Sequence, residues 1–306
     1  MAPITRSAAR KAFTASFLTP SAINIPEILE MILLQIDMRT LLISCQRVCR
    51  EWRNLITKSF PIQKVLFFTP IKEFEWGTGE KVHNSLLAEM FPTCFPGKGD
   101  EDDCEFDFSD CAMTKSSAGL DRFVRKGASW RMMLVQQPPI LELGLFHIDS
   151  CMGGDSAPSI IIPASPKQTA NGEEGLRMGR LFEILLFDST IRHGRFPSKQ
   201  LCWSADMPFD IHFRHKRHKV LFHRMLGQSG LVLYTKQVIQ CMMGYRNTFN
   251  GGEAKMNIIE AYEAHGLDVD SQEEEIIAYR ISAEEELERS DTDSSFDEDE
   301  REDLDE

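Results

Sequence analysis

A stretch of 32 residues near the start of the chain, residues 25–56, constrains the fold most because it is both apolar and periodic. Eighteen of the 32 residues are apolar, which is a larger share than the 42% of the whole chain. Their spacing of three and four residues is that of one face of an α-helix. The first such face comprises Ile28, Leu29, Ile32, Leu33 and Ile36. After a break, a second face comprises Leu41, Leu42, Cys45, Val48, Cys49 and Trp52.

The residues around these faces are of the types that begin helices. Asn24 is predicted to cap the first helix, with Pro26 in its first turn and Glu27 at the capping-box position. Residues 37–40 break the pattern, and Thr40 is predicted to cap the helix that follows. A helical unit of about 35 residues cannot bury so wide an apolar surface on itself, because chains this small rarely build a core alone. The surface must contact the rest of the chain or another protein, and periodicity leaves both open.

The order of residues in this stretch resembles an F-box of the fungal type. The matching pattern is Ile-Pro-Glu-Ile-Leu at residues 25–29, Ile32-Leu33, Ile36, Leu41-Leu42, Val48-Cys49, Trp52 and Leu55-Ile56. Further along, the sequence GASWRMMLVQQPP at residues 127–139 is similar to a stretch found in many fungal F-box proteins. Two positions depart from the common pattern, since Asp37 stands where proline is frequent and Thr40 where an acid is frequent. The alternative is a buried helical pair of some other fold.

The resemblance implies a three-helix module that docks on the Skp adaptor of a cullin–RING ubiquitin ligase. The residues implied for the adaptor contact are Pro26, Leu29, Ile32, Leu33, Ile36, Leu41, Leu42, Val48, Cys49 and Trp52. Such a subunit recruits a client protein and holds it near the ubiquitin-charged enzyme, so it needs no catalytic residue, cofactor or metal. The runner-up function is an F-box scaffold or nuclear regulator that acts outside a ligase. The client itself cannot be read from the sequence.

The chain's negative charge is concentrated at its C-terminal end. The net charge is −13, yet residues 268–306 contain 19 acids and 3 arginines, a balance of −16. The preceding residues 1–267 therefore carry +3, from 28 acids and 31 Lys and Arg. A segment so acidic and so poor in apolar residues is expected to be mostly disordered.

The sequence predicts an α+β body between the helical module and the acidic tail. Helices are expected at residues 84–91, 129–135 and 176–188, and strands at 65–68, 140–148, 160–162, 201–203, 210–213, 219–223 and 230–240, the last four in an antiparallel set. The resulting organisation is a leader (1–22), an F-box (23–60), a recognition body (61–267) with flexible insertions near 96–118 and 152–175, and the tail (268–306). No repeat of 20 to 50 residues recurs that would indicate a propeller or solenoid.

Cysteine usage and hydropathy favour the cytosol or the nucleus. The eight cysteines form no CxxC pair and follow no secretory signal, so reduced thiols are expected. The apolar runs are far too short to span a bilayer. Residues 1–26 contain no acid and resemble a mitochondrial transit peptide in composition, but a disordered leader before the F-box is the favoured interpretation.

A basic stretch at residues 212–224 contains four histidines and five Lys and Arg residues. Zinc binding would need cysteine partners at defined spacing, which the stretch lacks. Nucleic acid is not expected as a partner, because stacking aromatics are sparse there. The favoured interpretation is an edge strand and turn with a solvated basic face, and the alternative is a dock for an acidic partner, including the chain's own tail. Phosphate-binding loops, nucleophile elbows and zinc-protease motifs are absent from the sequence.

Overall fold

The structure is a computed structural model in which two compact units divide the chain at residue 69. It describes residues 25–71, 81–96, 108–151, 154–164, 175–187, 195–204, 211–238 and 252–267. The predicted leader (1–22) and acidic tail (268–306) lie outside the described residues, as do parts of both predicted insertions.

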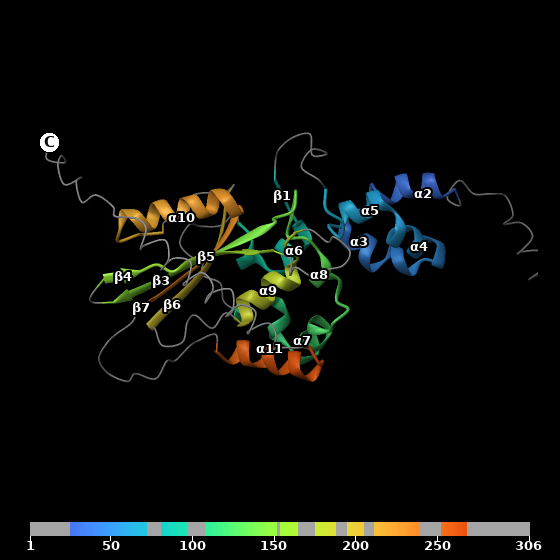
Figure 1. The fold of residues 1–306 in the computed structure, drawn as a ribbon. Helices are drawn as coiled ribbons and strands as arrows, with labels where there is room; N and C mark the ends of the chain where they lie inside the picture. The colour runs from blue at the N-terminus through green and yellow to red at the C-terminus, as the bar shows by residue number, and fades with distance from the viewer. Residues whose placement is uncertain are drawn as a thin grey trace, which may run out of the picture. The chain divides into compact units, whose positions relative to one another are not determined.

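Within residues 25–71, short helices build the N-terminal unit, which is blue in Figure 1. They are α2 (Pro26–Leu33), α3 (Met38–Ile43), the 3-10 turn η2 (Cys45–Arg47), α4 (Arg50–Lys58) and α5 (Phe60–Val65). Their apolar faces meet in a core of buried residues that comprises Leu29, Leu33, Leu41, Cys45, Ile56, Ile62 and Leu66. The predicted amphipathic helices therefore bury one side of their surface against one another.

Two predicted helix caps are wrong, for a shared reason. The N-cap of α2 is Ile25, which makes no side-chain cap, so Asn24 lies one residue too early, although Pro26 does begin the helix. The N-cap of α3 is Asp37, whose carboxylate accepts a hydrogen bond of 2.9 Å from the backbone N–H of Thr40. Thr40 is thus the capped residue rather than the cap. Residue type alone leaves the helix start uncertain by a few residues, and backbone geometry decides it.

The strand predicted at residues 65–68 is also wrong, because α5 and a turn occupy this segment. Ser59 caps α5 by accepting a hydrogen bond of 3.2 Å from the N–H of Ile62. Ile62 and Leu66 are both fully buried in the core of the N-terminal unit, and their spacing of four residues is helical. The unit thus continues beyond the predicted boundary at residue 60.

A five-stranded sheet forms the centre of the C-terminal unit. Its strands are β3 (Glu142–Cys151), β4 (Gly154–Ser156), β5 (Ser159–Pro163), β6 (Arg195–Trp203) and β7 (Leu231–Val238). The order is β4-β3-β7-β6, and β5 pairs with the first half of β3. The α+β class is confirmed. The sheet differs from a fully antiparallel set at one position, because β3 and β7 run parallel at its centre.

Helix α10 (Lys216–Ser229) covers one face of this sheet, as Figure 1 shows. Its apolar side chains lie against β3 and β7 in a buried cluster that comprises Phe146, Ile148, Cys202, Phe222, Met225, Leu226, Val232 and Tyr234. Gly144 allows the close approach, since a Cβ there would lie 2.7 Å from the side chain of Met225. Gly230 ends the helix in the left-handed conformation (φ 74°) and leads directly into β7.

The remaining described elements are short helices together with a second, two-stranded sheet of β1 and β2. They are β1 (Val82–His83), α6 (Ser85–Met90), η4 (Pro92–Cys94), η5 (Phe108–Asp110), η6 (Ala112–Lys115), α7 (Ser117–Val124), α8 (Ser129–Met132), β2 (Gln136–Gln137), α9 (Met178–Phe187) and α11 (Gly252–Ala264). Aromatic rings of Phe91, Trp130 and Phe182 pack together with centroids 5.3 to 5.8 Å apart. Among the described residues, no helix is both long enough and apolar enough to cross a membrane.

The predicted body elements have mixed outcomes. The helices expected at 84–91 and 176–188 are confirmed as α6 and α9, and the strands expected at 140–148, 160–162, 201–203 and 230–240 correspond to β3, β5, β6 and β7. The helix expected at 129–135 ends at Met132, and its N-cap is Ala128. The strand expected at 219–223 is wrong because α10 occupies it, and residues 211–213 of the strand expected at 210–213 are irregular.

Candidate protein interaction site

The N-terminal unit divides the ten predicted adaptor-contact residues by burial. Three are core residues, namely Leu29, Leu33 and Leu41. Three pack against that core while partly exposed, namely Ile36, Leu42 and Trp52. Four are exposed, namely Pro26, Ile32, Val48 and Cys49. The exposed group can contact a partner without any change in the fold, whereas the buried group holds the unit together; contact with an adaptor stays a prediction for all ten.

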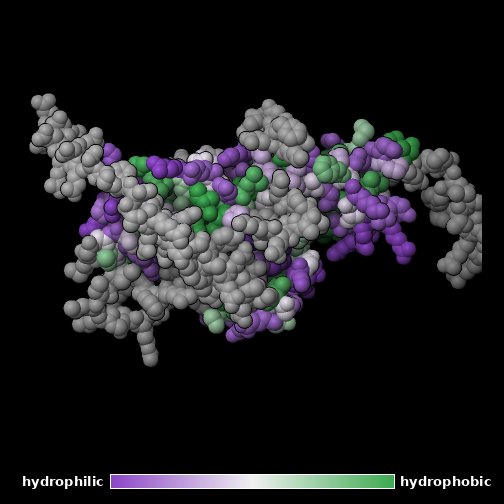
Figure 2. Space-filling view, in the orientation of Figure 1, coloured by the Kyte–Doolittle hydropathy of each residue, from purple (hydrophilic) through white to green (hydrophobic). Residues whose placement is uncertain are grey.

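Large apolar side chains are exposed on this unit, and they include two predicted contact residues, Ile32 and Val48, together with several that were not predicted. The most exposed are Met31 (67%), Val48 (60%), Phe60 (58%) and Ile43 (50%), followed by Ile25, Ile32, Val65 and Ile28. Figure 2 shows hydrophobic residues on the surface over α2. Met31 stands two positions after the buried Leu29, so it lies off the periodic face that forms the core. An apolar residue at such a position is a sequence signal for exposed apolar surface that the prediction of the contact residues did not use. Exposed apolar surface of this kind marks interaction sites.

Local hydrogen bonds fix the turns that present this surface. The N–H of Thr40 lowers the pKa of the Asp37 carboxyl, so that Asp37 is ionised at neutral pH when it caps α3. A hydrogen bond from the Cys49 thiol lowers the pKa of Glu51 at the start of α4. Burial raises the pKa of the Cys45 thiol, which keeps it protonated in the core. The departure from the F-box pattern at Asp37 therefore replaces proline by a capping carboxylate.

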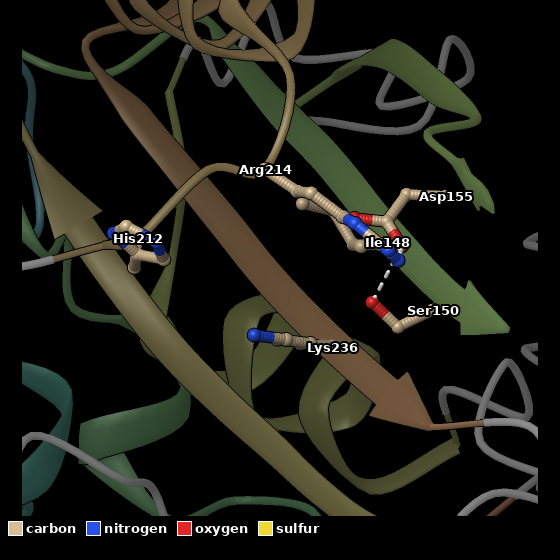
Figure 3. A pocket seen from close by; sticks show the side chains of 6 residues that line it. All are labelled: Ile148, Ser150, Asp155, His212, Arg214 and Lys236. Carbon is tan, nitrogen blue, oxygen red and sulfur yellow. Dashed lines mark hydrogen bonds and ion pairs between the residues drawn. The ribbon is translucent and has the colours of Figure 1, made fainter. Parts of the chain in front are cut away.

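A pocket of about 320 Å³ opens in the C-terminal unit, on the face of the sheet that α10 covers (Figure 3). Its lining consists of Ile148, Ser150, Asp155, His212, Arg214 and Lys236. Asp155 accepts a hydrogen bond of 2.8 Å from the Ser150 hydroxyl and lies 3.6 Å from a guanidinium nitrogen of Arg214. Its side chain is 4% exposed, whereas that of Arg214 is 61% exposed. The pocket thus combines one satisfied carboxylate with a surplus of basic groups.

The basic stretch belongs to this region, but as a helix rather than a strand. His218, Phe222, Met225, Leu226 and Ser229 are the buried residues of α10, and Figure 2 shows hydrophilic residues along this helix. Burial, together with Arg217 and His215, lowers the pKa of His218, so this histidine is neutral at pH 7. Within the part of the chain that the structure describes, no three His, Cys, Asp or Glu side chains are grouped to hold a metal ion.

A buried polar network lies on the opposite face of the sheet. His147 contacts the Thr235 hydroxyl through Nδ1 at 2.7 Å and the Asp149 carboxylate through Nε2 at 2.8 Å, and Gln237 donates to Asp149 at 2.5 Å. The order hydroxyl, imidazole and carboxylate is that of a nucleophile with its base. However, His147 and Thr235 are 6% and 3% exposed, and the described pocket is on the other face. The arrangement satisfies a buried histidine and joins β3 to β7.

Comparison with known families identifies the N-terminal unit. Residues 24–64 match the F-box domain, which confirms the F-box resemblance over this segment. No curated protein matches the chain, and no solved structure does. As a family, F-box domains bind the Skp adaptor of ubiquitin ligase complexes and are generally non-catalytic. The match carries no information on organism, so the fungal type stays a prediction. The N-terminal helical unit therefore contains an F-box domain, which residues 24–64 form.

Proposed function

We propose that this protein is a substrate-recruiting subunit of a Skp–cullin–F-box ubiquitin ligase. The F-box domain holds the Skp adaptor and, through it, the cullin, while the C-terminal unit holds a client protein. The proposed places of action are the cytoplasm and the nucleus.

The observation that carries the proposal is apolar surface left over after the F-box core is complete. Leu33, Leu41 and Ile56 are fully buried, so the unit already has its own core. Met31, Ile43 and Val48 nevertheless remain at least half exposed. Complete burial of such a side chain is worth roughly 1.5–3 kcal/mol, so burial of its exposed half by a partner is worth roughly 1 kcal/mol. The exposed residues on the F-box domain are therefore suited to a protein interface.

The mechanism that follows involves no bond chemistry by this chain. An adaptor bound to one unit and a client bound to the other are held in one complex, so a client lysine meets the ubiquitin-charged enzyme at high effective concentration. The division of the chain at residue 69 suits this role, because each unit has its own core and can present its own surface.

The second candidate function is that of a scaffold outside a ligase. The basic helix α10 supports this candidate, because a basic surface without acidic partners can recruit other proteins without any ligase. Recovery of a cullin separates the two functions. The tagged full chain is purified from cells under conditions that preserve complexes, and the Skp adaptor and cullin are quantified by mass spectrometry. A ligase subunit recovers both in comparable amounts, whereas a scaffold recovers the adaptor without the cullin.

A matched control makes that comparison specific. The variant Val48→Asp places a charge on the exposed face of the F-box, and Val82→Asp does the same at an exposed valine of the C-terminal unit. We expect the first to lose adaptor and cullin together and the second to retain both. Cullin recovery that persists in Val48→Asp while adaptor recovery is lost would rule out the proposed order of assembly.

A further inference from the structure

The region around α10 carries an unusual excess of positive charge. Residues 211–230 contain five Lys and Arg residues and no acid. Of these, Lys216, Arg217, Lys219 and Arg224 are exposed. Arg214 forms an ion pair with Asp155. Within the described residues, the other four cations, which are exposed on α10, have no acidic partner. Helices normally gain stability from Glu and Lys four residues apart, and α10 has no such pair.

The pocket beside α10 adds to this excess. Figure 3 shows the Lys236 amine and the His212 ring at its wall, with the Arg214 guanidinium next to Asp155. Asp155 is hydrogen-bonded to Ser150 and ion-paired with Arg214, whereas Lys236 has no ion pair within the described residues. A volume of about 320 Å³ is enough to admit the carboxylate of an acidic side chain.

The shape of the basic surface favours an extended acidic peptide over other anions. The exposed cations of α10 spread over a helix of 14 residues, about 21 Å long at 1.5 Å per residue, which a small free anion cannot cover. Single-stranded nucleic acid would require aromatic rings free to stack on bases. The aromatic rings next to this surface are engaged, since Phe222 is 1% exposed and Phe213 packs against it with centroids 5.3 Å apart.

The chain itself contains an acidic segment that fits this description. Residues 268–306 carry a net charge of −16 and begin four residues after α11 ends at Ala264. An extended chain of these 39 residues reaches up to about 130 Å, whereas a unit of this size is roughly 45 Å across. A covalently attached segment acts at an effective concentration of about millimolar, which a separate acidic protein rarely reaches. We propose that residues 268–306 bind in cis along α10 and into the pocket at Lys236.

The consequence is that the chain masks its own basic surface. An acidic partner of α10 has to displace the C-terminal segment first, and salt weakens the intramolecular contact because exposed charges are screened. This contact is independent of the F-box domain, so it holds whether or not a cullin is bound.

Zero-length cross-linking of the full chain tests the proposal. A carbodiimide joins an amine to a carboxylate only when the two are in contact, and mass spectrometry locates each link. We expect links from Lys216, Lys219 and Lys236 to acids of residues 268–306, in the monomer, with a yield that is unchanged on tenfold dilution. Raising the salt from about 0.01 M to 1 M, which shortens the Debye length from about 30 Å to 3 Å, should reduce these links at least fivefold.

Two charge-matched double variants complete the test. Arg217→Glu with Lys236→Glu should reduce the links from Lys216 and Lys219 at least threefold, and Arg214 is kept because it pairs with the buried Asp155. Arg122→Glu with Lys126→Glu makes the same charge change at exposed positions of α7 and the turn after it, and should leave the links unchanged. Should Arg217→Glu with Lys236→Glu fail to fold, Arg217→Gln with Lys236→Gln removes the same two positive charges without reversing them, leaves every carboxylate of residues 268–306 in place, and makes the same prediction. Links confined to dimers, or equally strong at Lys115 and Lys126, would overturn the proposal.

Discussion

The substitution Leu41→Ala tests whether the F-box core is assigned correctly. Leu41 is fully buried, and truncating a buried leucine typically costs about 2–5 kcal/mol. A folded unit of some 45 residues has a total free energy of unfolding of roughly 2–7 kcal/mol at 0.05–0.15 kcal/mol per residue. The cost is therefore comparable with the whole stability of the N-terminal unit, and the variant should unfold this unit for a measurable fraction of the time.

Leu42 provides the matched control, because it is the neighbouring residue of the same type and is only partly buried against the same core. We expect Leu42→Ala to cost about half as much, since it removes less contact and leaves a smaller cavity. The assay is hydrogen exchange of the full chain, read separately on peptides from α3 and α4 and on peptides from β3 and β7. Leu41→Ala should accelerate exchange in the helices by about 30- to 3,000-fold, at 1.4 kcal/mol for each factor of ten.

The strands provide the internal reference, because β3 and β7 belong to the other unit and should exchange as in the unmodified chain. Equal acceleration by Leu41→Ala and Leu42→Ala would refute the burial argument. Equal acceleration in the helices and in the strands would refute the independence of the two units. The experiment also separates two causes of lost adaptor binding, since a loss in Leu41→Ala reflects unfolding rather than a missing contact.

Three further predictions concern single sites. Asp37→Ala should lower the melting temperature of the N-terminal unit more than Asp37→Asn. Because folding lowers the pKa of Asp37, its stabilising contribution is present above the unfolded pKa of about 3.8 and is lost as the pH falls through the folded pKa, so an equal effect of Asp37→Ala at pH 7 and at pH 2 would contradict the prediction. Gly230→Ala should cost about 1–2 kcal/mol in a urea titration, because its φ of 74° disfavours any residue with a Cβ. Asp149→Ala should cost about 1–3 kcal/mol by leaving a ring nitrogen of the buried His147 without its acceptor, and an unchanged denaturation midpoint would show that the network is not structural.

The sequence predicted the existence of the N-terminal helices better than their ends. The spacing of Ile28, Leu29, Ile32 and Leu33 is enough to predict α2, because a core face must recur with the helical period. Asp37 rather than Thr40 caps α3 because Asp37 is the residue with the extended backbone that an N-cap requires. Residue type alone does not predict which of the two adopts that conformation. The sequence also did not predict which apolar residues of α2 are buried. This helix is apolar on more than one side, and the sequence does not say which side faces the core.

The C-terminal unit was harder to predict because its decisive contacts are distant in sequence. β3 and β7 pair in parallel although about 80 residues separate them, and no local pattern specifies that pairing. α10 was mistaken for a strand because its many basic residues obscured the buried positions Phe222, Met225 and Leu226, which have helical spacing. The pocket at Lys236 could not be predicted at all, since its lining comes from β3, β4, β7 and the segment before α10.

The affinity of the purified full chain for a purified Skp adaptor tests the central claim most directly. Ile32 and Val48 are 43% and 60% exposed on the F-box domain, so burial of their remaining surface is worth roughly 2 kcal/mol together. Ile32→Ala with Val48→Ala should therefore weaken binding by about 30-fold without altering hydrogen exchange in the N-terminal unit. Val82→Ala, at a 42% exposed valine of the other unit, should leave the affinity unchanged. Failure of the unmodified chain to bind the adaptor, or equal affinity in the double variant, would contradict the account.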